Sequence, residues 1–87
     1  MRTFTLTVSS PEGDVYRGEV VSLRVRGTEG ELAVLAGHVP FVTPLRACEC
    51  KIELEDGEIR LGQTDGGLLT VSCNKATLLS GSFAWKE

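Results

Sequence analysis

The sequence of 87 residues lacks any long apolar run, which excludes a membrane-spanning helix of about 20 consecutive apolar residues. It also lacks an excess of positive charge, since nine Lys and Arg stand against twelve Asp and Glu. A nucleic-acid-binding surface therefore has no electrostatic support. The first residues alternate apolar and polar instead of forming the continuous apolar segment of a secretory signal. We expect a cytoplasmic protein that neither binds nucleic acid nor inserts into a membrane.

The sequence is also poor in the residues that build metal and catalytic sites. It has one histidine, His38, and three cysteines, Cys48, Cys50 and Cys73. In a strand, Cys48 and Cys50 would lie about 6.5 Å apart, too far for a zinc site or a strain-free disulfide. Thiols on an apolar strand face are inert, so we predict no metal, no catalytic residue and no cofactor. A small metalloprotein using these four residues stays as an alternative.

No segment repeats apolar residues every 3.6 positions, so nothing indicates an amphipathic helix. Short segments instead alternate apolar and polar residues, as do strands that bury one face. Eight or more such segments, separated by glycine and proline turn signals, predict one all-β domain over residues 1–87, either a sandwich or a barrel. The side chains expected to face the core in the first two strands are Phe4, Leu6, Val8, Val21, Leu23 and Val25.

Turn signals predict several connections between these strands. Residues 10–13 (SPEG) have the chemistry of a type I turn, and residues 27–30 form a tight hairpin. Gly18 is expected to mark a bulge or bend. Residues 65–67 (DGG) precede a strand and not a helix, so we expect a bulge with close backbone approach there, not a phosphate loop.

The dipeptide at 56–57 (DG) predicts a hairpin with a two-residue loop. Such a loop would place Ile52 opposite Leu61 and Glu53 opposite Arg60. Apolar side chains would then share one face and opposite charges the other. The charged side chains expected on solvated sheet faces are Arg24, Arg26, Glu49, Glu53 and Arg60.

The last hairpin allows two alignments, with its loop at residues 73–74 or at 74–75. The first alignment pairs Leu69 with Leu78 and Thr70 with Thr77, which matches apolar with apolar side chains better. We therefore prefer the loop at 73–74, which places a cysteine at a turn tip. The segment that follows is expected to end in a final strand or a docked tail.

Residues 36–44 (AGHVPFVTP) depart from this regular pattern. They are mostly apolar, yet they neither alternate like a strand nor repeat like a helix. An irregular apolar loop on a β scaffold needs something to pack against, so we predict a binding site there. One possibility is a freestanding β-sandwich module that binds a ligand in a pocket bounded by Val39, Phe41 and Val42.

Residues 27–45, GTEGELAVLAGHVPFVTPL, resemble the central block of the epsilon subunit of F-type ATP synthases. That block reads Gly-x-Glu-Gly-Glu-Leu/Ile, then Gly-His-x-Pro, then Thr-x-Leu/Ile. Residues 6–18 (LTVSSPEGDVYRG) resemble the first hairpin of the family, and residues 66–71 (GGLLTV) resemble a later segment. Two departures are Ala36, where proline is common, and residues 73–74 (CN), where Pro-Gly is common.

The resemblance implies a flattened antiparallel β-sandwich of about ten short strands. The family usually continues into a C-terminal helical hairpin that inhibits ATP hydrolysis. We expect no such helical domain within residues 1–87, which are either a naturally short form or a fragment of a longer chain.

The resemblance also implies a non-catalytic rotor subunit that couples the gamma subunit to the c-ring of a proton-translocating enzyme. This subunit would be peripheral, at the cytoplasmic face of the cell membrane. The implied contact residues are Glu29 and Glu31 toward the c-ring, and His38, Val39, Pro40, Phe41 and Val42 toward gamma.

Overall fold

The computed structural model describes residues 2–86, and these residues form nine strands and no helix. No helix that could span a membrane is therefore found in this range. The all-β prediction is confirmed, with nine strands where about ten were expected. The strands are β1 (Phe4–Ser10), β2 (Gly13–Gly27), β3 (Gly30–Leu35), β4 (Phe41–Leu45), β5 (Cys48–Leu54), β6 (Ile59–Thr64), β7 (Gly67–Ser72), β8 (Lys75–Leu79) and β9 (Phe83–Trp85).

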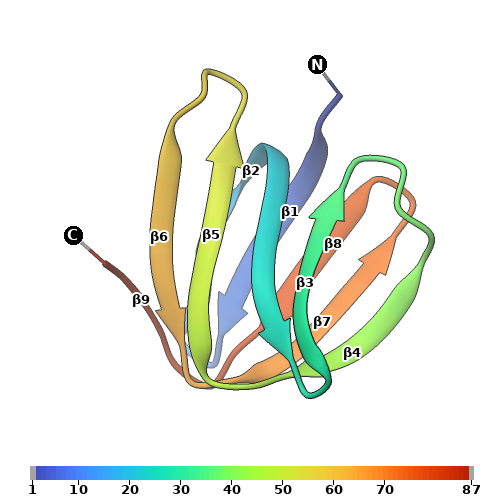
Figure 1. The fold of residues 1–87 in the computed structure, drawn as a ribbon. Coiled ribbons are helices and arrows are strands. Elements are labelled where there is room, and N and C mark those ends of the chain that lie inside the picture. The colour runs from blue at the N-terminus through green and yellow to red at the C-terminus, as the bar shows by residue number, and fades with distance from the viewer. Residues whose placement is uncertain (1, 87) are drawn as a thin grey trace.

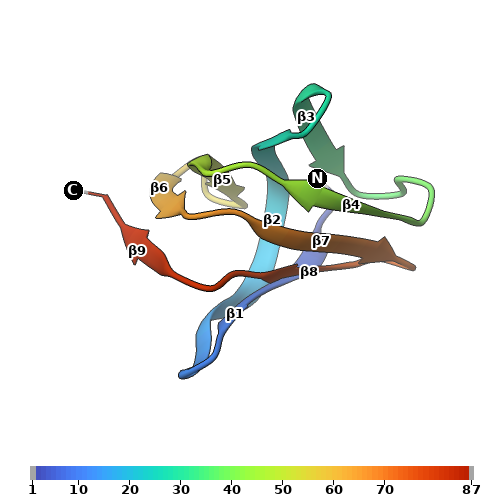
Figure 2. The same cartoon turned by 90° about the horizontal axis from the view of Figure 1, so that it is seen from below.

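The strands pack as two layers, which confirms the predicted sandwich (Figure 1). One layer runs β9-β6-β5-β2-β3 and the other runs β1-β8-β7-β4. The long strand β2 joins them, because its first half pairs with β1 and its second half with β3 and β5. Every pair is antiparallel except β1 with β8, which is parallel. Figure 2 shows β9 at one outer edge, beside β6 and away from β3.

The hydrophobic core fills the space between the two layers. Most strands contribute alternate residues, because side chains at positions i and i+2 face the same way. The buried apolar side chains are Phe4, Leu6, Val8, Val20, Leu23, Val25, Val34, Leu45, Cys50, Ile52, Leu69, Val71, Ala76 and Leu78. Five of the six inward positions predicted for the first two strands are therefore confirmed.

Strand β2 departs from the prediction at two places. Gly18 is not a bulge, because it pairs regularly with Leu6, and the bulge lies instead at Val15, which the pairing with β1 skips. Gly18 is needed for space, since a Cβ there would lie 2.9 Å from the hydroxyl oxygen of Tyr16. Val21, predicted to face the core, is only half-buried because the pairing with β5 skips it.

The hairpin between β5 and β6 has a three-residue loop, 55–57, not the predicted two-residue loop. The N–H of Gly57 donates to the carbonyl oxygen of Leu54 (3.0 Å), and the N–H of Leu54 donates to the carbonyl oxygen of Glu58 (2.9 Å). Gly57 has a φ of 89°, the left-handed conformation that glycine supplies at the end of such a loop. The predicted register is therefore wrong by one residue.

This slip exchanges the two faces of β6, because side chains alternate with a period of two. Arg60 lies opposite Ile52 on the inner face, and Ile59 lies opposite Glu53 on the outer face. The prediction of a solvated Arg60 is wrong. Its guanidinium carbon lies 4.1 Å from the centroid of the Trp85 ring, where the positive charge interacts with the aromatic face.

The hairpin between β7 and β8 has the predicted register. Leu69 lies opposite Leu78, Thr70 lies opposite Thr77, and the exposed Cys73 lies at the turn tip. The predicted close backbone approach at 65–67 is also confirmed. A Cβ on Gly67 would lie 1.9 Å from the carbonyl oxygen of Leu79, so only glycine fits there.

Residues 36–44 are only partly irregular, because β4 begins at Phe41 and pairs with β7. The prediction of an irregular loop is wrong for 41–44. Pro44 is tolerated in this strand because β4 pairs with β2 at one residue only, Leu45, so most of that edge of β4 is unpaired. The loop itself is thus confined to 36–40.

Candidate protein interface

Short-range contacts hold the loop that joins β3 to β4. The N–H of His38 donates to the carbonyl oxygen of Leu35 (3.2 Å), at the end of β3. Gly37 between them has a φ of 84°, which glycine adopts without steric cost. The His38 ring lies 4.9 Å from the Phe41 ring between centroids, and its Nδ1 lies 3.0 Å from the carbonyl oxygen of Val39. These contacts give the loop a defined shape.

Three apolar side chains around this loop face solvent, and we call Leu35, Val39 and Val42 the loop patch. They are 55%, 70% and 61% exposed. Pro40 is also exposed, whereas Phe41 is half-buried and packs against the core. Phe41 therefore anchors the loop, and the valines on either side of it present apolar surface.

The predicted acidic contact residues lie at the turn between β2 and β3. Gly27 pairs with Gly30, so Glu29 lies at the tip of a two-residue turn. Glu31 follows on β3, directly opposite Arg26 on β2. Both carboxylates are exposed. We call Glu29 and Glu31 the acidic tip.

The loop patch and the acidic tip lie at opposite ends of β3 (Figure 1). Glu31 and Leu35, one from each group, are four residues apart on this strand, which is about 13 Å at about 3.3 Å per residue. The predicted site residues therefore form two separate surfaces and not one site.

The loop patch encloses no ligand pocket. The cavity beneath it, lined in part by Val34, Leu35 and His38, has a volume of only 10 Å³. Small-molecule sites usually have about 300–1,000 Å³. A larger hollow of 400 Å³ lies between the acidic tip and β4, and of the three predicted pocket residues only Phe41 lines it, while Val39 and Val42 do not. The geometry therefore favours a flat contact surface over the alternative of a ligand-binding module.

A second apolar surface, on the outer face of β4, β7 and β8, escaped the sequence reasoning. Pro44 lies opposite Leu68, and Leu68 lies opposite Leu79. Leu68 and Leu79 are 39% and 48% exposed. We call Val42, Leu68 and Leu79 the outer strip. The signal was present, because an inward Leu69 places Leu68 on the opposite face of the same strand.

The cysteines occupy three different environments. Cys50 is buried, and this burial raises the pKa of its thiol to about 12, so the thiol is unreactive. The Cys48 sulfur, half-buried, accepts a hydrogen bond from the N–H of Arg26 (3.3 Å). Within residues 2–86, no three His, Cys, Asp or Glu side chains lie close enough together to hold a metal ion.

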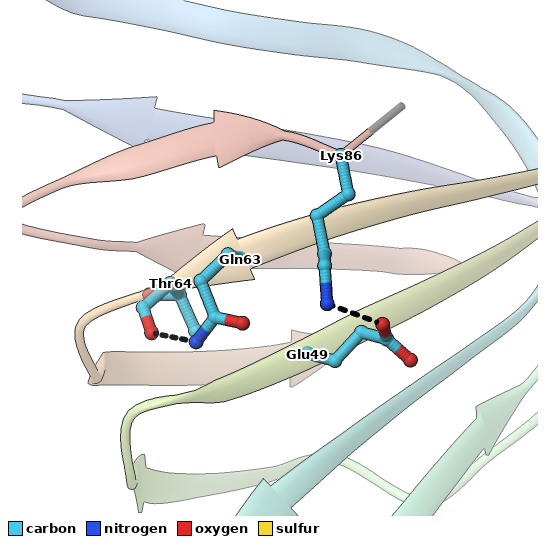
Figure 3. Close-up of polar contacts among 4 residues, drawn as sticks. All are labelled: Glu49, Gln63, Thr64 and Lys86. Atoms are coloured by element: carbon cyan, nitrogen blue, oxygen red, sulfur yellow. Dashed lines mark hydrogen bonds and ion pairs between the residues drawn. The ribbon is translucent and has the colours of Figure 1, made fainter.

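The last strand is held firmly against β6, which confirms the predicted final strand. A Cβ on Gly62 would lie 2.3 Å from the Phe83 ring, so this glycine makes room for that ring. The Nζ of Lys86 reaches across β6 to Oε2 of Glu49 on β5, 2.9 Å away (Figure 3). Both side chains are about half exposed, so the ion pair contributes at most about 1 kcal/mol. Packing therefore contributes more than charge to holding β9.

Comparisons with known proteins agree with this architecture. The family described as ATP synthase, Delta/Epsilon chain, beta-sandwich domain matches residues 3–86. A chain in the mitochondrial ATP synthase of Euglena gracilis is 24% identical over 95% of this chain, with a TM-score of 0.91. A chain in the central stalk/c-ring of Tetrahymena thermophila mitochondrial ATP synthase is 13% identical over 94%, with a TM-score of 0.77. The present chain spans 53% and 66% of those two chains.

Proposed function

We propose that this chain, which belongs to the family of β-sandwich domains of ATP synthase delta and epsilon chains, is a non-catalytic subunit of an F-type rotor. In this role it couples the gamma subunit to the c-ring, so that rotation driven by protons reaches the catalytic sites. The family match over residues 3–86 carries the proposal. The fold shared with chains of two ATP synthases supports it.

The proposal assigns the two surfaces to different partners. The acidic tip contacts the c-ring, and the loop around His38, Val39, Pro40, Phe41 and Val42 contacts gamma. Two partners need two surfaces, and the acidic tip and the loop patch lie at opposite ends of β3, with Glu31 and Leu35 about 13 Å apart along the strand. Carboxylates at the tip suit polar loops of the ring and not lipid, so the chain is peripheral, at the cytoplasmic face of the membrane.

The gamma-facing surface extends, in this proposal, from the loop patch onto the outer strip. Val42 belongs to both, and Leu68 and Leu79 continue the apolar surface across β7 and β8. Contiguous exposed apolar patches rimmed by polar residues mark protein interaction sites. Thr70 and Thr77 pair beside these leucines and carry no charge, whereas Lys75, opposite Ser72, places one charge at the end of this face.

Direct binding tests the proposal. Purified chain is mixed with folded gamma subunit, and complex formation is followed by size-exclusion chromatography. A complex at micromolar concentration is expected, and its absence would refute the role assigned to this chain.

The Glu31→Ala variant tests the acidic tip separately. Glu31 is exposed and forms no ion pair within residues 2–86, so the melting temperature should stay within about 2 °C of the parent. Assembly on isolated c-ring should weaken. Glu58→Ala, an exposed carboxylate in the loop region between β5 and β6, is the matched control. A lower melting temperature with normal assembly would show that the residue is structural.

A further inference from the structure

A basic hollow lies on the outer face of the β2–β5 layer, separate from the loop patch and the outer strip and bordered by Glu31 of the acidic tip. Its volume is 560 Å³. Three cationic side chains line it, Arg24 and Arg26 from β2 and Lys51 from β5. The other lining residues are Val25, Glu31, Ala47, Cys48 and Glu49.

The hollow arises because β2 and β5 separate at this point. Their pairing ends at Arg24 and Lys51. Beyond this pair, the backbone N–H of Arg26 donates a hydrogen bond to the Cys48 sulfur. The carbonyl oxygen of Arg26 accepts a second hydrogen bond from the N–H of Arg46 (3.0 Å). The chain entering β5 thus crosses the end of β2, and the small side chain of Ala47 leaves the space open.

The three cations in this hollow form no ion pair within residues 2–86, although Glu31, which lies opposite Arg26, and Glu49 also line it. Arg24 lies directly opposite Lys51, an arrangement of like charges that destabilises a sheet. Across β3 its other neighbour is the uncharged Ala33. Within residues 2–86 the one ion pair joins Lys86 to Glu49, so no carboxylate lies within ion-pair distance of these three cations. Their side-chain N–H groups also make no hydrogen bond in this range.

The geometry points to a binding site for a phosphate-bearing anion, with Arg24, Arg26 and Lys51 as its ligands. Two guanidinium groups offer forked donors that match phosphate oxygens, and the ammonium adds a third charge. The volume lies within the range of small-molecule sites, about 300–1,000 Å³. Three cations in a protein of net charge −3 are too few for a nucleic acid and sufficient for one or two phosphate groups. The site does not depend on the rotor role proposed above.

The test titrates the ¹⁵N-labelled purified chain with inorganic pyrophosphate and follows amide shifts by NMR. Shifts should concentrate at residues 24–26 and 47–51 and saturate with a Kd of about 1 mM or tighter. Arg24→Gln should raise this Kd at least about tenfold, because a charge-assisted hydrogen-bonding group is lost. The melting temperature of the Arg24→Gln variant should not fall, since the substitution removes the like-charge repulsion between Arg24 and Lys51. Arg17→Gln, an exposed arginine on β2 outside the hollow, should bind like the parent.

A second arm distinguishes a free phosphate from a lipid headgroup. Vesicles of phosphatidylcholine with and without phosphatidylglycerol are sedimented with the chain, and pyrophosphate is added as competitor. If the chain sediments only with vesicles that contain phosphatidylglycerol, and pyrophosphate reverses this, the ligand of the site is a lipid headgroup. If the chain binds pyrophosphate but does not sediment with vesicles, the ligand is a free phosphate compound. No binding in either arm, or binding that Arg24→Gln leaves unchanged, overturns the site.

Discussion

Replacing the two most exposed valines with threonine tests the gamma-facing surface most directly. Val39 is 70% exposed and Val42 is 61% exposed, so most of their side-chain area is still available for burial against a partner. Each substitution exchanges a methyl group for a hydroxyl and so forfeits roughly 1 kcal/mol of apolar burial. The double variant should bind gamma about 30-fold more weakly, equivalent to about 2 kcal/mol.

Threonine keeps the shape and the strand preference of valine, so folding should be unaffected. Isothermal titration calorimetry against gamma measures the affinity, and thermal denaturation confirms the fold. Ile59→Thr is the matched control, since Ile59 is 43% exposed on the outer face of β6 in the other layer. Unchanged affinity in the double variant, or an equal loss in the control, would refute the assignment of this surface.

Three further predictions concern stability. Gly67→Ala should destabilise the fold by about 3 kcal/mol or more in urea denaturation, since its Cβ would overlap the Leu79 carbonyl. Gly13→Ala, with similar φ but open space, should cost only about 1 kcal/mol, and equal losses would contradict the steric explanation. Arg60→Leu should cost about 1–2 kcal/mol and speed hydrogen exchange at Trp85, and unchanged exchange would exclude the stacking role. Because burial raises the pKa of Cys50 from 9.0 to about 12, the unfolded thiol ionises first, and stability should fall above pH 9.0 by up to about 1.4 kcal/mol per pH unit. Cys50→Ala should remove this part of the slope, and an identical slope would contradict the burial argument.

The two hairpins with strong turn signals show where local reasoning succeeds and fails. In the β7–β8 hairpin, Asn74 has a φ of 55°, a left-handed conformation that asparagine tolerates, and the predicted register holds. In the β5–β6 hairpin, Gly57 takes a similar conformation but closes a loop one residue longer. An Asp-Gly pair fits both loop lengths, and matching the apolar residues of β5 and β6 favoured the shorter loop, which is wrong.

The candidate surfaces were predictable to different degrees. The acidic tip follows from a glycine-bounded turn, which places Glu29 in solvent wherever the hairpin packs. Exposed apolar side chains were predicted around residues 36–44 and are found there, but Phe41 packs against the core through a strand that no local pattern indicated. The outer strip depends on Pro44 meeting Leu68, a pairing between segments far apart in the chain.

By itself, the sequence determined most of the strands, most of the inward residues and the resemblance to a rotor subunit. These features rest on alternation and turn chemistry, which act within a few residues. Only the tertiary structure decided how β4 pairs, which face Arg60 occupies and where Arg24, Arg26 and Lys51 meet. Each of these depends on contacts between segments distant in the chain, and the free energy of such contacts is decided by packing and not by local preference.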